Sequence, residues 1–128
     1  MSGTNGTVLV ADDQPEVRQV LGAMLARLGY TPVLAASGAE AVAAFRAGRA
    51  GVVAAILDVQ MPGMVGPAAL AALRAIDPGL PCVFLSGHTG TYSAADLLGR
   101  GVAAVLGKPV PLDLLNDTLA AAVASMPA

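Results

Sequence analysis

Residues Val53-Ala54-Ala55-Ile56-Leu57-Asp58 form an apolar run that stops at a carboxylate. The run shows no alternation of apolar and polar side chains, so both of its faces should be buried, as in the central strand of a parallel sheet. Four other short apolar runs lie at residues 7–11, 33–36, 82–86 and 103–106. Segments in which apolar residues recur every three to four positions lie between these runs and after the last one. This alternation predicts a βα-repeat and an α/β fold.

The second run has Pro32 at its start, which favours a place at the edge of the sheet. Right-handed crossovers with a reversal after the second strand give the order 2-1-3-4-5. We therefore predict a flavodoxin-like, doubly wound, five-stranded parallel sheet with five helices. One domain is expected at residues 7–124, with a flexible N-terminal tail at 1–6 and a C-terminal tail at 125–128.

Composition limits the classes of function. The 128 residues suffice for one domain, and a net charge of -2 with scattered arginines gives no basic stripe for direct contact with nucleic acid. No continuous apolar stretch of 18 residues occurs, and Met1 to Gly6 lack the features of a signal peptide, so we expect no membrane insertion and a cytoplasmic location. The single Cys82 excludes a disulfide within one chain.

Polar residues gather where the predicted strands end. Asp12 and Asp13 end the first strand and Asp58 the third, while Ser86 ends the fourth and Lys108 follows the fifth. Ligands bind at the carboxyl ends of strands in open α/β sheets, so these side chains should share one crevice. Three carboxylates there would repel each other unless a cation neutralised them, and Mg²⁺ prefers such oxygen ligands.

The other two side chains of this crevice, those of Ser86 and Lys108, are suited to phosphoryl transfer. A phosphoryl group moving to Asp58 would spread negative charge over three oxygens. The metal, the ammonium of Lys108 and the hydroxyl of Ser86 could each stabilise one of them. Lys108 is the only lysine in the chain.

These motifs resemble the receiver domain of two-component response regulators over residues 7 to about 124. The motifs that carry the resemblance are Asp12-Asp13, Asp58 with Met61-Pro62-Gly63, Ser86-Gly87 and Lys108-Pro109. The resemblance implies that Asp58 is the phosphoacceptor and that Ser86 and Lys108 bind the phosphoryl oxygens. It also implies that Asp13 binds Mg²⁺ directly, Asp12 largely through water, and Gln60 through its backbone carbonyl.

The resemblance further implies a phosphorylation-dependent switch. A histidine kinase or a histidine phosphotransfer protein would donate the phosphoryl group, and a conformational change would pass the signal to an unknown downstream protein. The chain would catalyse only its own phosphoryl transfer and dephosphorylation, as a monomer or a weak phosphorylation-dependent dimer. It could be a stand-alone regulator or the receiver of a hybrid histidine kinase. Val105 stands where many relatives carry an aromatic residue that takes part in the switch.

Other classes fit the residues less well. A haloacid-dehalogenase-like phosphatase needs a second Asp two positions after the first, where this chain has Gln60. A P-loop needs four residues between its glycines and Ser or Thr after the lysine, but Gly101 and Gly107 enclose five and Pro109 follows Lys108. A flavodoxin-type protein binds a phosphate in its first loop, which Asp12-Asp13 would repel. The alternative that stays open is an interaction domain of the same fold that signals without phosphorylation.

Overall fold

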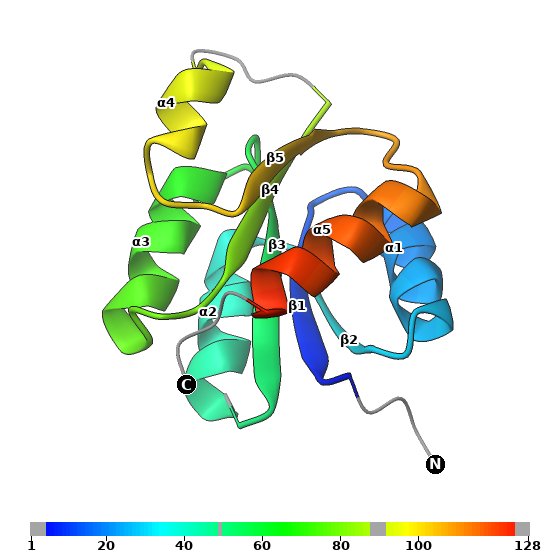
Figure 1. The fold of residues 1–128 in the computed structure, drawn as a ribbon. Helices are drawn as coiled ribbons and strands as arrows, with labels where there is room; N and C mark the ends of the chain where they lie inside the picture. Colours follow the sequence, from blue (N-terminus) through cyan, green and yellow to red (C-terminus); the bar gives the residue numbers. More distant parts are fainter. Residues whose placement is uncertain (1–4, 49, 88–91, 125–128) are drawn as a thin grey trace.

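The computed structural model describes residues 5–48, 50–87 and 92–124. Within these ranges five parallel strands form one sheet with the order β2-β1-β3-β4-β5 (Figure 1). The strands are β1 (Thr7–Ala11), β2 (Thr31–Ala35), β3 (Val52–Asp58), β4 (Cys82–Ser86) and β5 (Ala104–Gly107). The helices are α1 (Pro15–Arg27), α2 (Gly38–Ala47), α3 (Gly66–Ile76), α4 (Ala94–Leu98) and α5 (Leu112–Ala124). The predicted βα-repeat and strand order are confirmed.

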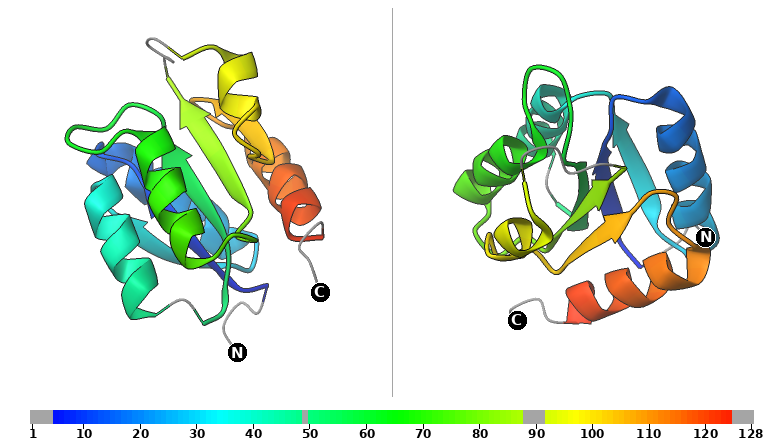
Figure 2. Two further views of the ribbon diagram at one scale, coloured as in Figure 1. Left: turned by 90° about the vertical axis from the view of Figure 1, so that its left-hand side faces the viewer. Right: turned by 90° about the horizontal axis from the view of Figure 1, so that it is seen from above.

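Helices cover both faces of the sheet (Figure 2). On one face α1 and α5 contribute Leu21, Leu25, Leu115 and Leu119 to an apolar cluster with side chains of β1, β3 and β4. On the other face α2 and α3 pack against the sheet through a second apolar cluster, which also includes Leu97 of α4. The longest of these helices have 13 residues, and none in the described ranges is long and apolar enough to cross a membrane.

Serine hydroxyls cap the N-termini of two helices, α2 and α4. Ser37 Oγ accepts a hydrogen bond of 3.1 Å from the Glu40 N–H at the start of α2. Ser93 Oγ accepts one of 3.0 Å from the Asp96 N–H at the start of α4. The Glu40 carboxylate accepts from the N–H of Ala36, one residue before the N-cap, so this capping box differs by one residue from the expected pattern.

β2 lies at one edge of the sheet, as Pro32 predicts. The N–H of Thr31 and the carbonyl of Ala35 both form hydrogen bonds on the side of β1. Because backbone groups alternate in direction along a strand, those of Pro32 and Leu34 point to the open side. The missing N–H of Pro32 therefore leaves the pairing with β1 intact.

The register brings the carboxyl ends of four strands to one level. Asp58, the last residue of β3, is in register with the penultimate residue of β4. Ser86, the last residue of β4, pairs with Gly107 of β5, and Lys108 follows directly. Asp12 follows the end of β1, which pairs with β3. The backbone thus places the predicted site residues along one edge of the sheet.

Candidate functional site

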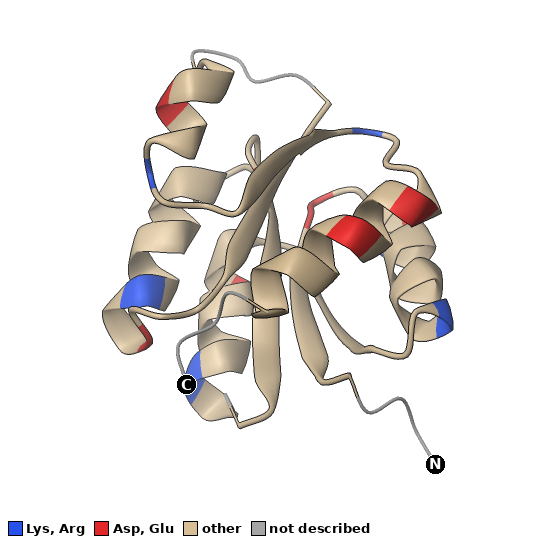
Figure 3. Ribbon diagram, viewed as in Figure 1, with Lys and Arg blue, Asp and Glu red and all other residues tan. Residues whose placement is uncertain are grey.

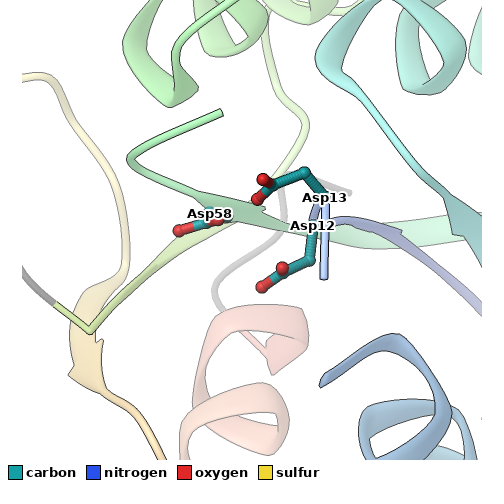
Figure 4. A group of neighbouring side chains, drawn as sticks. All are labelled: Asp12, Asp13 and Asp58. Carbon is teal, nitrogen blue, oxygen red and sulfur yellow. The ribbon is translucent and has the colours of Figure 1, made fainter. Parts of the chain in front are cut away.

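Three carboxylates converge at the ends of β1 and β3 (Figure 4). One oxygen each from Asp12, Asp13 and Asp58 lies within 4.8 Å of the other two. Asp12 is completely buried and Asp58 is 4% exposed, whereas Asp13 is exposed. The predicted convergence is confirmed, and its most accessible carboxylate is that of Asp13.

Lys108 connects two of these carboxylates. Its Nζ lies 2.9 Å from Oδ2 of Asp12 and 3.3 Å from Oδ1 of Asp58. The arginines that the structure describes are spread over α1, α2, α3 and the loop after α4 (Figure 3). The three carboxylates and the Lys108 ammonium leave an excess of two negative charges when all are ionised, and the Arg18 guanidinium on the Asp12 carbonyl reduces this excess to one. The remaining negative charge would attract a divalent cation.

The environment shifts the pKa values of both partners in the Asp58–Lys108 pair. Burial raises the pKa of Asp58 to about 6, and the negative charge of Asp12 adds to this effect, while Lys108 opposes it. Burial alone would lower the pKa of Lys108. Its contacts with Asp12 and Asp58 together raise that pKa above the usual value, so the ammonium stays charged at neutral pH.

The raised pKa of Asp58 predicts how stability depends on pH in the metal-free protein. Between the ordinary value of 3.8 and about 6, folded Asp58 holds a proton that unfolded Asp58 has lost. The stabilisation of the folded state by this proton is therefore present at low pH and disappears as pH rises through 6. An Asp58→Asn variant cannot titrate there, so its stability relative to the wild type should grow by about 2 kcal/mol from pH 4 to 7.

Urea unfolding of the two proteins in a chelating buffer at several pH values measures this difference. Groups far from Asp58 titrate alike in both proteins and cancel in the comparison. A difference in the free energy of unfolding that stays constant from pH 4 to 7 would contradict the raised pKa.

Ser86 ends β4, which pairs with β3, and Gln60 follows Asp58 by two residues. Oγ of Ser86 is buried and forms no hydrogen bond with any residue in the described ranges. The N–H of Lys108 donates to the Ser86 carbonyl at 3.1 Å, which ties the ends of β4 and β5 together. The N–H of Gln60 lies 3.4 Å from Oδ1 of Asp58. A buried hydroxyl without a hydrogen-bond partner is energetically costly, so Oγ of Ser86 is a candidate contact for a ligand.

Sequence reasoning missed two residues that hold this site. Gly66 approaches Asp58 so closely that a Cβ there would lie 2.6 Å from the Asp58 carbonyl oxygen, so only glycine fits. Arg18 of α1 donates from Nη1 to the Asp12 carbonyl at 2.8 Å. The Pro/Gly-rich turn before α3 could have suggested Gly66. Nothing in the sequence distinguishes Arg18 from a solvated residue on an amphipathic helix.

The chain matches known proteins over most of its length. Residues 8–120 match the family model of the response regulator receiver domain. The transcriptional regulatory protein GlrR of Escherichia coli K12 is 33% identical over 119 residues, which cover 93% of this chain and 26% of GlrR. The chain thus spans about a quarter of the length of this relative.

Solved structures show the same architecture. A response regulator receiver domain protein from Clostridium thermocellum superposes with a TM-score of 0.87 at 25% identity, over 93% of this chain and 94% of that one. The receiver domain of a sensor histidine kinase from Pseudomonas aeruginosa, solved with a magnesium ion in its active-site cleft, gives a TM-score of 0.83 at 27% identity, over 94% and 98%. With its strand order, its acidic cluster and the family match over residues 8–120, this chain belongs to the response regulator receiver domain family.

Proposed function

We propose that this receiver domain accepts a phosphoryl group on the carboxylate of Asp58 and changes conformation in response. The single observation that carries the proposal is the convergence of three carboxylates with the Lys108 ammonium, which contacts both Asp12 and Asp58. The donor is a phosphohistidine of a histidine kinase or of a histidine phosphotransfer protein, acting in the cytoplasm.

Four residues would hold Mg²⁺ in this site. Asp13 and Asp58 offer carboxylate oxygens, and Gln60 offers its backbone carbonyl. Asp12 already uses both oxygens within the protein, because Oδ1 accepts from the Gln14 N–H at 2.9 Å and Oδ2 pairs with Lys108. This arrangement suits a ligand that reaches the metal through water. When bound, Mg²⁺ supplies positive charge to the phosphoryl oxygens.

The chain's own residues then orient and stabilise the transferring group. Oγ of Ser86, which has no hydrogen-bond partner among the described residues, can donate to one phosphoryl oxygen. The Lys108 ammonium lies 3.3 Å from Oδ1 of Asp58 before transfer, so it can bind another oxygen with little movement. Positioning and charge stabilisation supply most of the catalysis of phosphoryl transfer.

The transfer exchanges one phosphorus bond for another. A carboxylate oxygen of Asp58 forms a bond to phosphorus while the bond from phosphorus to the donor's imidazole nitrogen breaks. The electron pair of the broken bond stays on that nitrogen, and Asp58 becomes an acyl phosphate. Attack of water at phosphorus later releases inorganic phosphate and restores the carboxylate, so the domain acts only on its own phosphoryl group.

A mass measurement tests the proposal directly. The protein is incubated with acetyl phosphate, with Mg²⁺ in one sample and with a chelator in the other. We expect the intact mass to rise by one phosphoryl group with Mg²⁺ and to stay unchanged with chelator. Absence of the mass increase with Mg²⁺, both from acetyl phosphate and from a phosphorylated histidine phosphotransfer protein, would refute phosphoryl acceptance.

A further inference from the structure

We propose that Arg18 is a positioning residue for the metal site. Its guanidinium fixes the peptide bond between Asp12 and Asp13 and thereby directs the Asp13 carboxylate toward the other two. The inference rests on the proposed function in one respect, namely that Mg²⁺ is the ligand of the carboxylate cluster.

The contacts of Asp12 show how completely this residue is held. Its N–H donates to the Ala35 carbonyl of β2 at 3.1 Å, and its carbonyl accepts from Nη1 of Arg18 at 2.8 Å. Oδ1 accepts from the Gln14 N–H, and Oδ2 pairs with Lys108. Arg18 therefore supplies the contact that orients the carbonyl side of this residue.

The loop between β1 and α1 has few other restraints. Gln14 is the N-cap of α1, and its side chain forms no capping hydrogen bond in the part of the chain that the structure describes. The loop depends instead on two side-chain hydrogen bonds, that of the Asp12 carboxylate to Gln14 and that of Arg18 to the Asp12 carbonyl.

The orientation of the Asp12 carbonyl determines the position of the Asp13 backbone. The carbonyl of Asp12 and the N–H of Asp13 belong to one planar peptide unit. The Asp13 side chain is exposed, and its carboxylate still lies within 4.8 Å of the cluster oxygens. Because this side chain is exposed, packing restrains it little, and the backbone that Arg18 holds sets the position from which it reaches the cluster. Contacts of this kind, one step removed from the metal, commonly set metal affinity.

Charge and position predict opposite effects for the loss of Arg18. Arg18 carries a positive charge next to a cation site, so as a charge alone it opposes Mg²⁺, and its removal would strengthen binding. As a positioning residue it aligns a metal ligand, and its removal would weaken binding. The sign of the change in affinity therefore separates the two roles.

The experiment measures Mg²⁺ dissociation constants by titration calorimetry for the wild type and three variants of the full chain. Arg18→Ala should weaken Mg²⁺ binding about tenfold. Arg18→Lys keeps the charge and one terminal donor, so it should bind more tightly than Arg18→Ala. Arg27→Ala removes an exposed arginine from the last turn of the same helix and should match the wild type. Circular dichroism and thermal unfolding establish that each variant is folded.

The outcomes distinguish this inference from the proposed function. Equal or tighter Mg²⁺ binding by folded Arg18→Ala would overturn the positioning role and leave the proposed function intact. Binding by Arg18→Lys as weak as that by Arg18→Ala would also overturn it, since the donor would then be irrelevant. A wild type that binds no Mg²⁺ would instead contradict the proposed metal site, whatever Arg18 does.

Discussion

Replacing Asp58 with Asn should abolish phosphoryl uptake from acetyl phosphate under conditions that label the wild type. An amide is a far poorer nucleophile for phosphorus than a carboxylate, so Asp58→Asn removes the attacking group from beside the Lys108 ammonium. The substitution keeps the size of the side chain and removes a charge that burial disfavours, so the fold should persist. Intact mass with Mg²⁺ present measures the effect.

Asp113→Asn is a matched control for this prediction. Asp113 is exposed in the first turn of α5, so the same chemical change there should leave phosphoryl uptake unaltered. Hydroxylamine should remove the label from the wild type, because it cleaves acyl phosphates. A folded Asp58→Asn protein that gains mass at the wild-type rate would show that another side chain is the acceptor.

Replacing Asp13 with Ala should weaken Mg²⁺ binding by at least about tenfold, because it removes the most accessible carboxylate of the cluster. The metal-free variant should be as stable as the wild type or slightly more stable, since one of three mutually repelling carboxylates is gone. Titration calorimetry measures the affinity, and thermal unfolding in a chelating buffer measures the stability.

Glu16→Ala separates loss of a ligand from loss of charge. Glu16 is an exposed carboxylate in the first turn of α1, near Asp13 in sequence and outside the cluster. Its removal should change Mg²⁺ affinity much less than Asp13→Ala does. If Asp13→Ala retained wild-type affinity, the metal would have to bind elsewhere in the protein.

The backbone arrangement was predictable because it follows from local patterns. Pro32 indicates the edge strand, the unbroken apolar run before Asp58 indicates a buried central strand, and right-handed crossovers then fix the order. Once the order is known, residues at strand ends must lie together. The convergence of Asp12 with Asp58 therefore follows from the topology, which the sequence predicts.

Contacts that depend on side-chain paths were not predictable in the same way. The position of Lys108 after the last strand places its backbone, yet its pairing with both Asp12 and Asp58 depends on rotamers and on the width of the crevice. Arg18 reaches back six residues to a carbonyl, a contact that no periodicity encodes. The close approach of Gly66 to Asp58 arises from the path of an irregular turn.

Val105 illustrates a further limit. It lies in β5 in register with Phe84 of β4, and it is half-buried against the apolar cluster on the side of α2 and α3. A β-branched side chain is stiff about χ1 and too small to move as a ring would. A switch of the kind that the resemblance implies would therefore have to use an element other than this residue.

The open side of β2 also bears on how the protein behaves at high concentration. An exposed strand edge can recruit a strand from another chain and so start aggregation. Here Pro32 removes one of the outward N–H donors, and the opposite edge of the sheet is β5, only four residues long. Neither edge offers a long, regular row of donors for such growth. Both edges of this sheet are therefore poorly suited to strand-by-strand pairing with the sheet of another molecule.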